Sequence, residues 1–198
     1  MKEIKSDTPS EQLNKEGELV DPSRRGFTKI GAIATSGVLL SLASRPILAA
    51  QCSISGMQSG NTSNPNKVTC QGCTPGFWLN PVGSVRWSPY SPGTCKDQNG
   101  NGSCKTWDSD GTKFHSVFSG SRYGTKTMAE VIRLTGVDDT YQLGAHACAA
   151  ILNALHLQNF GYSATDIITM WNTYYATQPE KLKATYMTLN ERSCPFGR

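Results

Sequence analysis

The sequence predicts a mainly α-helical protein, with about four short helices in the C-terminal half and a loop-rich, disulfide-clamped N-terminal half. Apolar residues recur at helical spacing from Thr125 onward, whereas no strand-like alternation runs longer than a few residues. Proline, glycine and asparagine are dense between Cys70 and Gly111, and the chain holds seven cysteines. We therefore expect one cross-linked domain in which helices pack behind ordered loops.

Residues 1–50 are predicted to be a removable export signal. Arg24 and Arg25 precede an uncharged, largely apolar run from Ile30 to Ser44, and they resemble the paired arginines of bacterial twin-arginine signals. The run of about fifteen residues is shorter than the roughly 20 that a membrane helix needs, which argues against a single anchor. We expect passage through the twin-arginine export machinery and cleavage by signal peptidase near Ala50. The product is expected in the periplasm, outside the cell or on its surface, with no membrane span.

After cleavage, residues 51–69 are expected to form an irregular arm pinned by Cys52, and residues 70–198 a single small α-rich domain. A lipid anchor on Cys52 is disfavoured because the residue before a modified cysteine is normally small, and here it is Gln51. The net charge is only +4 and no basic stripe is present, so nucleic acid is not an expected partner.

The helices of the C-terminal half are predicted from apolar spacing and from capping residues. Asp138 or Asp139 is suited to cap the helix that runs to about Leu157, and Ser163 with Asp166 approximates a capping box. Pro179 suits the first position of the last helix. The expected helices are 125–134, about 139–157, 164–175 and 179–189.

Several of these segments together resemble an exported bacterial domain family with a Thr-Pro-Gly-Tyr-Trp-Lys-Asn-His motif. The matching segments are Cys73–Asn80, Phe114 with Val117-Phe118, Ala145–Ala154, Asn190-Glu191 and Cys194-Pro195. Leu79 and Pro81 replace the Lys and His of that motif, so an activity that needs those two side chains would be absent. The resemblance implies a secreted or surface-attached protein of a family without an assigned reaction. It also implies that Cys194 pairs with Cys70 or Cys73, and Cys95 with Cys104.

Cysteines in an exported chain of this size are typical of a disulfide framework. Seven cysteines leave one unpaired, which is expected to be Cys148 on an apolar helix stripe or, alternatively, Cys52. The alternative is a metal or redox centre built from Cys70, Cys73, Cys95 and Cys104. The spacing of the later two cysteines does not fit a zinc ribbon, and no βαβ pattern surrounds the Cys-x-x-Cys motif.

The segment that begins at Asp97 partly matches a calcium-binding loop. Asp97, Asn99, Asn101 and Asp108 supply oxygen atoms at suitable positions, and a glycine stands sixth. Lys105 occupies the ninth position, however, where a ligand is wanted. A solvated Asn/Gly turn is the favoured interpretation and a weak calcium site the alternative; no other cofactor is expected.

Two polar residues of the second predicted helix, His146 and Asn153, are expected on the face opposite its apolar stripe, from which they could point into a shared groove. A lone histidine on a polar helix face is more often solvated than catalytic. No nucleophile motif accompanies them. The sequence therefore favours a non-enzymatic secreted or cell-surface module that acts in adhesion, assembly or ligand binding. An exported metal or redox protein is the alternative, and a hydrolase that uses His146 is the least favoured hypothesis.

Overall fold

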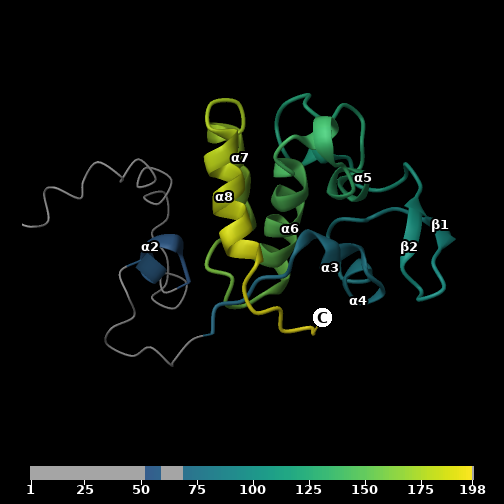
Figure 1. Ribbon diagram of the computed structural model, residues 1–198, viewed down its shortest axis with the longest axis horizontal. Helices are drawn as coiled ribbons and strands as arrows, with labels where there is room; N and C mark the ends of the chain where they lie inside the picture. The colour runs from purple at the N-terminus through teal and green to yellow at the C-terminus, as the bar shows by residue number, and fades with distance from the viewer. Residues whose placement is uncertain (1–51, 59–68, 198) are drawn as a thin grey trace, which may run out of the picture. The chain divides into compact units, whose positions relative to one another are not determined.

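The computed structural model describes residues 52–58 and 69–197, and the predicted export signal lies outside them. This part of the chain is largely helical, as expected from the sequence, and carries three disulfides. The four C-terminal helices are α5 (Met128–Ile132), α6 (Leu143–His156), α7 (Ala164–Tyr174) and α8 (Pro179–Asn190). Helix α6 packs against each of the other three, and Figure 1 shows it beside α8.

Local capping contacts fix where these helices begin. Capping boxes form between Thr127 and Glu130 at α5 and between Ser163 and Asp166 at α7. Helix α6 begins later than predicted, because a 3-10 turn, Gly136–Asp139, precedes it. The Asp139 carboxylate still caps the helix, since it accepts hydrogen bonds from the backbone N–H groups of Leu143, Gly144 and Ala145 at 3.0, 3.0 and 3.3 Å.

The front half contains more regular structure than the sequence predicted. The segment from Cys70 to Gly111 was expected to form loops, but it contains α3 (Pro75–Leu79), α4 (Pro81–Ser84) and the antiparallel strands β1 (Cys95–Gln98) and β2 (Cys104–Trp107). A 3-10 turn, Phe114–Ser116, follows. Both short helices start with a proline, which is pre-organised for a first helical turn. The arm expected to be irregular holds a short helix, α2 (Ile54–Gln58).

The core is aromatic and lies between the helices and the front loops. Phe114 stacks on Phe118 with ring centroids 4.7 Å apart, and Trp171 meets Phe114 edge-on at 5.0 Å. Each buried indole N–H of Trp87 and Trp171 donates to a backbone carbonyl, at 2.8 Å in both cases. The aromatic side chains are therefore fixed in orientation as well as buried.

The three disulfides join Cys52 to Cys70, Cys73 to Cys194, and Cys95 to Cys104, while Cys148 is a free, buried thiol. Of the two partners left open for Cys194, the structure selects Cys73, and Cys52 is paired rather than free. The two sulfurs of the Cys-x-x-Cys motif are bonded to different partners. No described helix is long and apolar enough to cross a lipid bilayer.

The disulfides are expected to contribute unequally to stability. The Cys73–Cys194 bond closes a loop with a sequence separation of 121, against 9 for Cys95–Cys104. Loop entropy alone then gives about 5 kcal/mol for the first bond and about 2.5 kcal/mol for the second. Urea denaturation of the two double Cys→Ser variants measures these losses, with Cys148→Ala as a variant that keeps all three bonds. Equal losses from the two double variants would contradict this ranking.

Candidate functional site

An open groove of about 600 Å³ lies beside the Cys73–Cys194 disulfide. One wall is the segment that carries the Thr-Pro-Gly-Phe sequence, and the other is the chain that follows α8. The lining residues are Gly72, Thr74, Gly76, Phe77, Asn80, Glu191, Arg192, Ser193, Cys194 and Gly197. The groove therefore lies between two of the segments on which the family resemblance is based, Cys73–Asn80 and Cys194-Pro195.

Backbone contacts hold the two walls in register. Gln71 and Ser193 form a parallel β-bridge, and the Gly72 N–H donates to the Ser193 carbonyl at 3.2 Å. A Cβ atom on Gly72 would lie 2.1 Å from the Leu189 carbonyl oxygen. Only glycine permits this close approach to the end of α8, so the groove depends on the absence of a side chain at that position.

Aromatic side chains support one end of the groove. Phe77 stacks on Phe196 with ring centroids 5.7 Å apart, and Trp78 meets Phe77 edge-on at 5.2 Å. The Arg86 guanidinium lies 5.0 Å from the centroid of the Phe196 ring, within cation–π range. The C-terminal segment is thereby held against α3 by ring contacts in addition to the disulfide.

Behind the groove, Asn153 of α6 binds the turn through every polar atom of its side chain. Its Oδ1 accepts from the Cys73 backbone N–H at 3.0 Å and from the Trp78 indole N–H at 3.3 Å. Its Nδ2 donates to the Cys73 carbonyl and to Asn190 Oδ1, both at 2.8 Å. Asn153 is wholly buried, on the face of α6 that the sequence placed opposite the apolar stripe.

Asn190 extends this network to His146. Its Nδ2 donates to the His146 carbonyl at 2.9 Å and lies 3.4 Å from His146 Nδ1. His146 is only 6% exposed, which corrects the sequence-based expectation of a solvated side chain. Burial, with a smaller contribution from the nearby Lys183 charge, lowers the pKa of His146 to about 4. The imidazole is therefore neutral at pH 7.

Within the described residues, the polar neighbour of the His146 side chain is the Asn190 amide, and neither a hydroxyl nor a thiol is bonded to that side chain. The free Cys148 is fully buried, and desolvation raises the pKa of its thiol well above the usual range. A thiol held in its neutral form is a poor nucleophile and a poor metal ligand.

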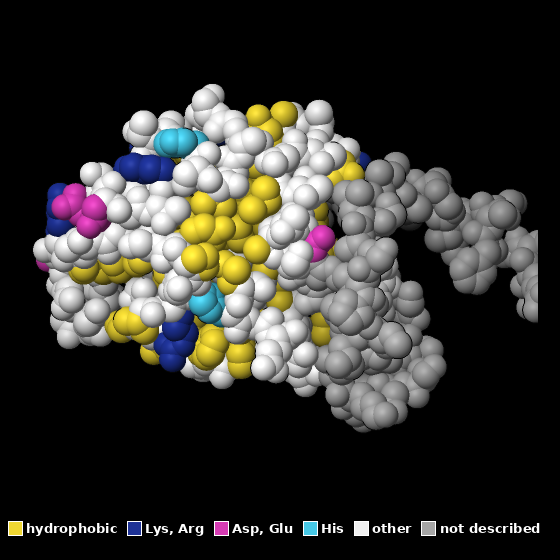
Figure 2. Space-filling model, turned by 180° about the vertical axis from the view of Figure 1, so that it is seen from behind, with side chains coloured by type: hydrophobic (Ala, Val, Ile, Leu, Met, Phe, Trp, Pro, Cys, Tyr) yellow, Lys and Arg dark blue, Asp and Glu magenta, His cyan; other side chains and the backbone are white. Residues whose placement is uncertain are grey.

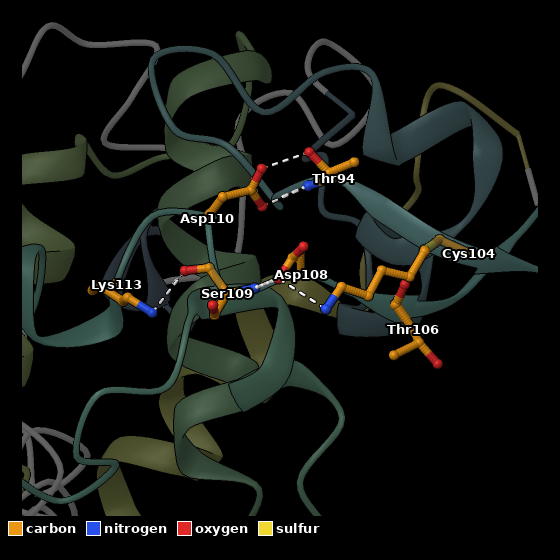
Figure 3. A network of polar contacts seen from close by, with 8 residues as sticks. Thr94, Cys104, Thr106, Asp108, Ser109, Asp110 and Lys113 are labelled. Carbon is orange, nitrogen blue, oxygen red and sulfur yellow. Dashed lines mark hydrogen bonds and ion pairs between the residues drawn. The ribbon is translucent and has the colours of Figure 1, made fainter.

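The residues of the predicted calcium loop lie in and directly after the hairpin of β1 and β2. Asp97 lies on β1, 3.7 Å from the Lys105 ammonium, and Asp108 follows β2, 3.0 Å from that of Lys96. Thr94 binds both carboxylate oxygens of Asp110 (Figure 3). Asn99 and Asn101 lie in the turn, where Asn101 Oδ1 accepts the Ser103 N–H at 3.0 Å. Calcium binding there stays a prediction.

In the described part of the chain, no three His, Cys, Asp or Glu side chains gather in a way that could hold a metal ion. The sulfurs of Cys70, Cys73, Cys95 and Cys104 are all in disulfides, and a bridged sulfur is not a thiolate ligand. These cysteines therefore act as cross-links in this structure.

Hydrophobic side chains also gather in the middle of one face, which Figure 2 shows from behind. The most exposed large aliphatic side chains among the described residues are Val137, Val85, Val82 and Leu155. Val82 and Val85 lie in and directly after α4, next to the segment that forms the groove wall.

Sequence reasoning missed the groove and most of the network behind it. Asn190 and Trp78 stand in segments that were singled out for their resemblance, but not as polar partners of Asn153. Two asparagines could have indicated the network from the sequence: Asn153 stands in the alanine-rich segment of α6, and Asn190 stands at the end of α8. An amide in such a context needs an internal partner.

Asn153→Asp tests the network with a nearly isosteric change. The carboxylate has no N–H to offer the Cys73 carbonyl or Asn190 Oδ1, so acceptors would face each other in a buried site. We expect a loss of about 3 kcal/mol or more in the free energy of unfolding, measured by urea denaturation at pH 7. Asn101→Asp in the exposed hairpin turn is the matched control and should cost less than about 1 kcal/mol. Equal effects would show that the amide network is not a principal source of stability.

Comparisons with models of protein families, with curated proteins and with solved structures returned no match. The likeness to exported domains with the Thr-Pro-Gly-aromatic-Trp motif therefore depends on the residues quoted above and stays a prediction. The groove, the disulfides and the amide network are the observations from which function is argued.

Proposed function

We propose that this protein is an exported, non-enzymatic module that binds a surface or extracellular partner through the groove beside Cys73–Cys194. The observation that carries the proposal is the way the groove is built. Its walls come from segments about 120 residues apart, and a disulfide, a backbone bridge and a buried amide network hold them together. A preformed, rigid concave surface loses little entropy when a partner binds.

The side chains offered in the groove suit binding. Thr74, Glu191 and Ser193 are exposed there, beside the edge of the buried Phe77 ring. Polar groups that fix orientation around an apolar base are the usual composition of a binding site. The polar side chains with catalytic potential, His146 among them, are used instead to join helices behind the groove.

The disulfides support an exported location. Three disulfides in one small domain are typical of proteins that mature in an oxidising compartment. The resemblance of Arg24-Arg25 and the following apolar run to a twin-arginine signal points the same way. We propose that the mature protein acts in the periplasm or at the cell surface.

Site-specific photo-crosslinking in the exporting cells tests the groove. A benzophenone amino acid placed at Thr74 or at Glu191, both exposed in the groove, is expected to form a light-dependent adduct with the same partner. The same probe at Val137, which is 94% exposed and does not line the groove, is the control and should give no such adduct. Adducts from Val137 alone, or from none of the three positions, would contradict binding at the groove.

A second measurement separates this proposal from a metal or redox function. Thiol titration of the purified exported protein is expected to give one thiol, released only on unfolding because Cys148 is buried. Metal analysis is expected to give no stoichiometric zinc or iron. Four thiols together with a bound metal ion would instead favour a metal or redox protein.

A further inference from the structure

The buried side chains behind the groove form a hydrogen-bond chain that has a single direction. At one end, the Cys73 backbone N–H and the Trp78 indole N–H are donors that cannot become acceptors. They fix Asn153 with its oxygen toward them and its Nδ2 toward Asn190 Oδ1. Asn190 must then present its own Nδ2 to His146.

At the other end of this series of hydrogen bonds, Asn190 Nδ2 is a donor and requires acceptors on His146. Asn190 Nδ2 donates to the His146 carbonyl and points its second hydrogen toward His146 Nδ1, at 3.4 Å. Nδ1 accepts only in the neutral imidazole that carries its hydrogen on Nε2. A proton on Nδ1 would place two donors face to face. Reversing the Asn190 amide would not relieve this, because its nitrogen would then face the Asn153 nitrogen.

The surroundings also oppose a positive charge on His146. Lys183 of α8 is the charged residue that acts on it, and Lys183 borders a second, open pocket of about 520 Å³. The carboxylates of the elements packed on α6 lie elsewhere: Asp139 caps α6, Glu130 caps α5 and Asp166 caps α7. Glu180 of α8 is hydrogen-bonded to Tyr141, and Asp138 is exposed. Helix α3 brings no titratable side chain. A carboxylate that would stabilise a histidinium is therefore not among these neighbours.

We propose that His146 is an acid-sensitive latch of the groove: its protonation disrupts the amide chain and releases the Cys73–Trp78 turn from α6 and α8. The neutral imidazole completes the hydrogen bonds of Asn190, which completes those of Asn153, which holds the turn. When the imidazole takes up a proton, Asn190 Nδ2 loses its second acceptor and keeps only the His146 carbonyl, and the restraint on the turn weakens. The groove wall is then held by the Cys73–Cys194 bond, the Gln71–Ser193 bridge and the ring contacts.

The direction of the effect follows from proton uptake. Burial lowers the pKa of His146 to about 4 from an ordinary value near 6.5. Between these values the unfolded or opened chain binds a proton that the closed structure does not. Stability is therefore complete above about pH 6.5 and falls as the pH drops toward 4, by up to about tenfold in the equilibrium constant per pH unit.

The experiment compares the exported protein with its His146→Asn variant between pH 7 and pH 4. Asparagine offers an oxygen near the place of Nδ1 and does not titrate. We expect the unfolding equilibrium constant of the unmodified protein to rise by about 100-fold more than that of the variant over this range. Hydrogen-exchange protection of the Cys73 amide and the Trp78 indole should fall in parallel. His115→Asn, at an exposed histidine bonded to the Gly124 carbonyl, is the control and should keep the original pH dependence.

Nuclear magnetic resonance of the unmodified protein tests the same idea without a substitution. The His146 ring and the Trp78 indole N–H signals should shift with one common midpoint well below pH 6.5. A His146 titration that leaves the Trp78 signal unmoved would overturn the latch, as would a His146→Asn variant that folds and retains the full acid sensitivity. Partner binding at the groove is measured separately, so a failed latch leaves the proposed function untouched.

Discussion

The amide of Asn153 is the interaction on which the rest of the domain depends. It is wholly buried, both of its polar atoms are bonded to the Cys73 backbone, and Nδ2 is also bonded to Asn190 at the end of α8. An amide buried without partners would cost several kcal/mol, so the turn at Cys73, the end of α8 and the middle of α6 must stay in register for it to be satisfied. Apolar packing alone allows small slips between helices, whereas a donor and an acceptor at fixed positions do not. The relative position of the two groove walls is determined by this constraint.

The C-terminal helices could be predicted because their signals are local. Ser163 with Asp166 at α7 and Pro179 at α8 each act within one turn of the start of their helix. The hairpin and the two short helices of the front half could not, since their stability comes from the Cys95–Cys104 bond and from packing on distant residues. Arg133, just after α5, binds the carbonyls of Cys104 and Lys105 and so anchors the hairpin from 28 residues away.

The candidate site was hidden from the sequence for a related reason. A polar residue on a helix normally indicates a solvent-facing side, which is why His146 was expected to be solvated. Its partner Asn190 lies 37 residues from Asn153, and Cys73 lies 80 residues away. Periodicity reports which residues share a face of one helix, but not what covers that face. Only the tertiary structure shows that α8 and the Cys73 turn close over it.

The two kinds of restraint on the groove differ in how they respond to conditions. The Cys73–Cys194 bond limits how far its walls can separate, and it persists for as long as the compartment is oxidising. The amide chain determines the exact position of the turn within that limit, and it depends on an imidazole that must stay neutral. With the Cys73–Cys194 disulfide in place, protonation of His146 would loosen the Cys73–Trp78 turn while the domain stays folded. A surface module that meets acid outside the cytoplasm would in this way change its binding face while keeping its fold.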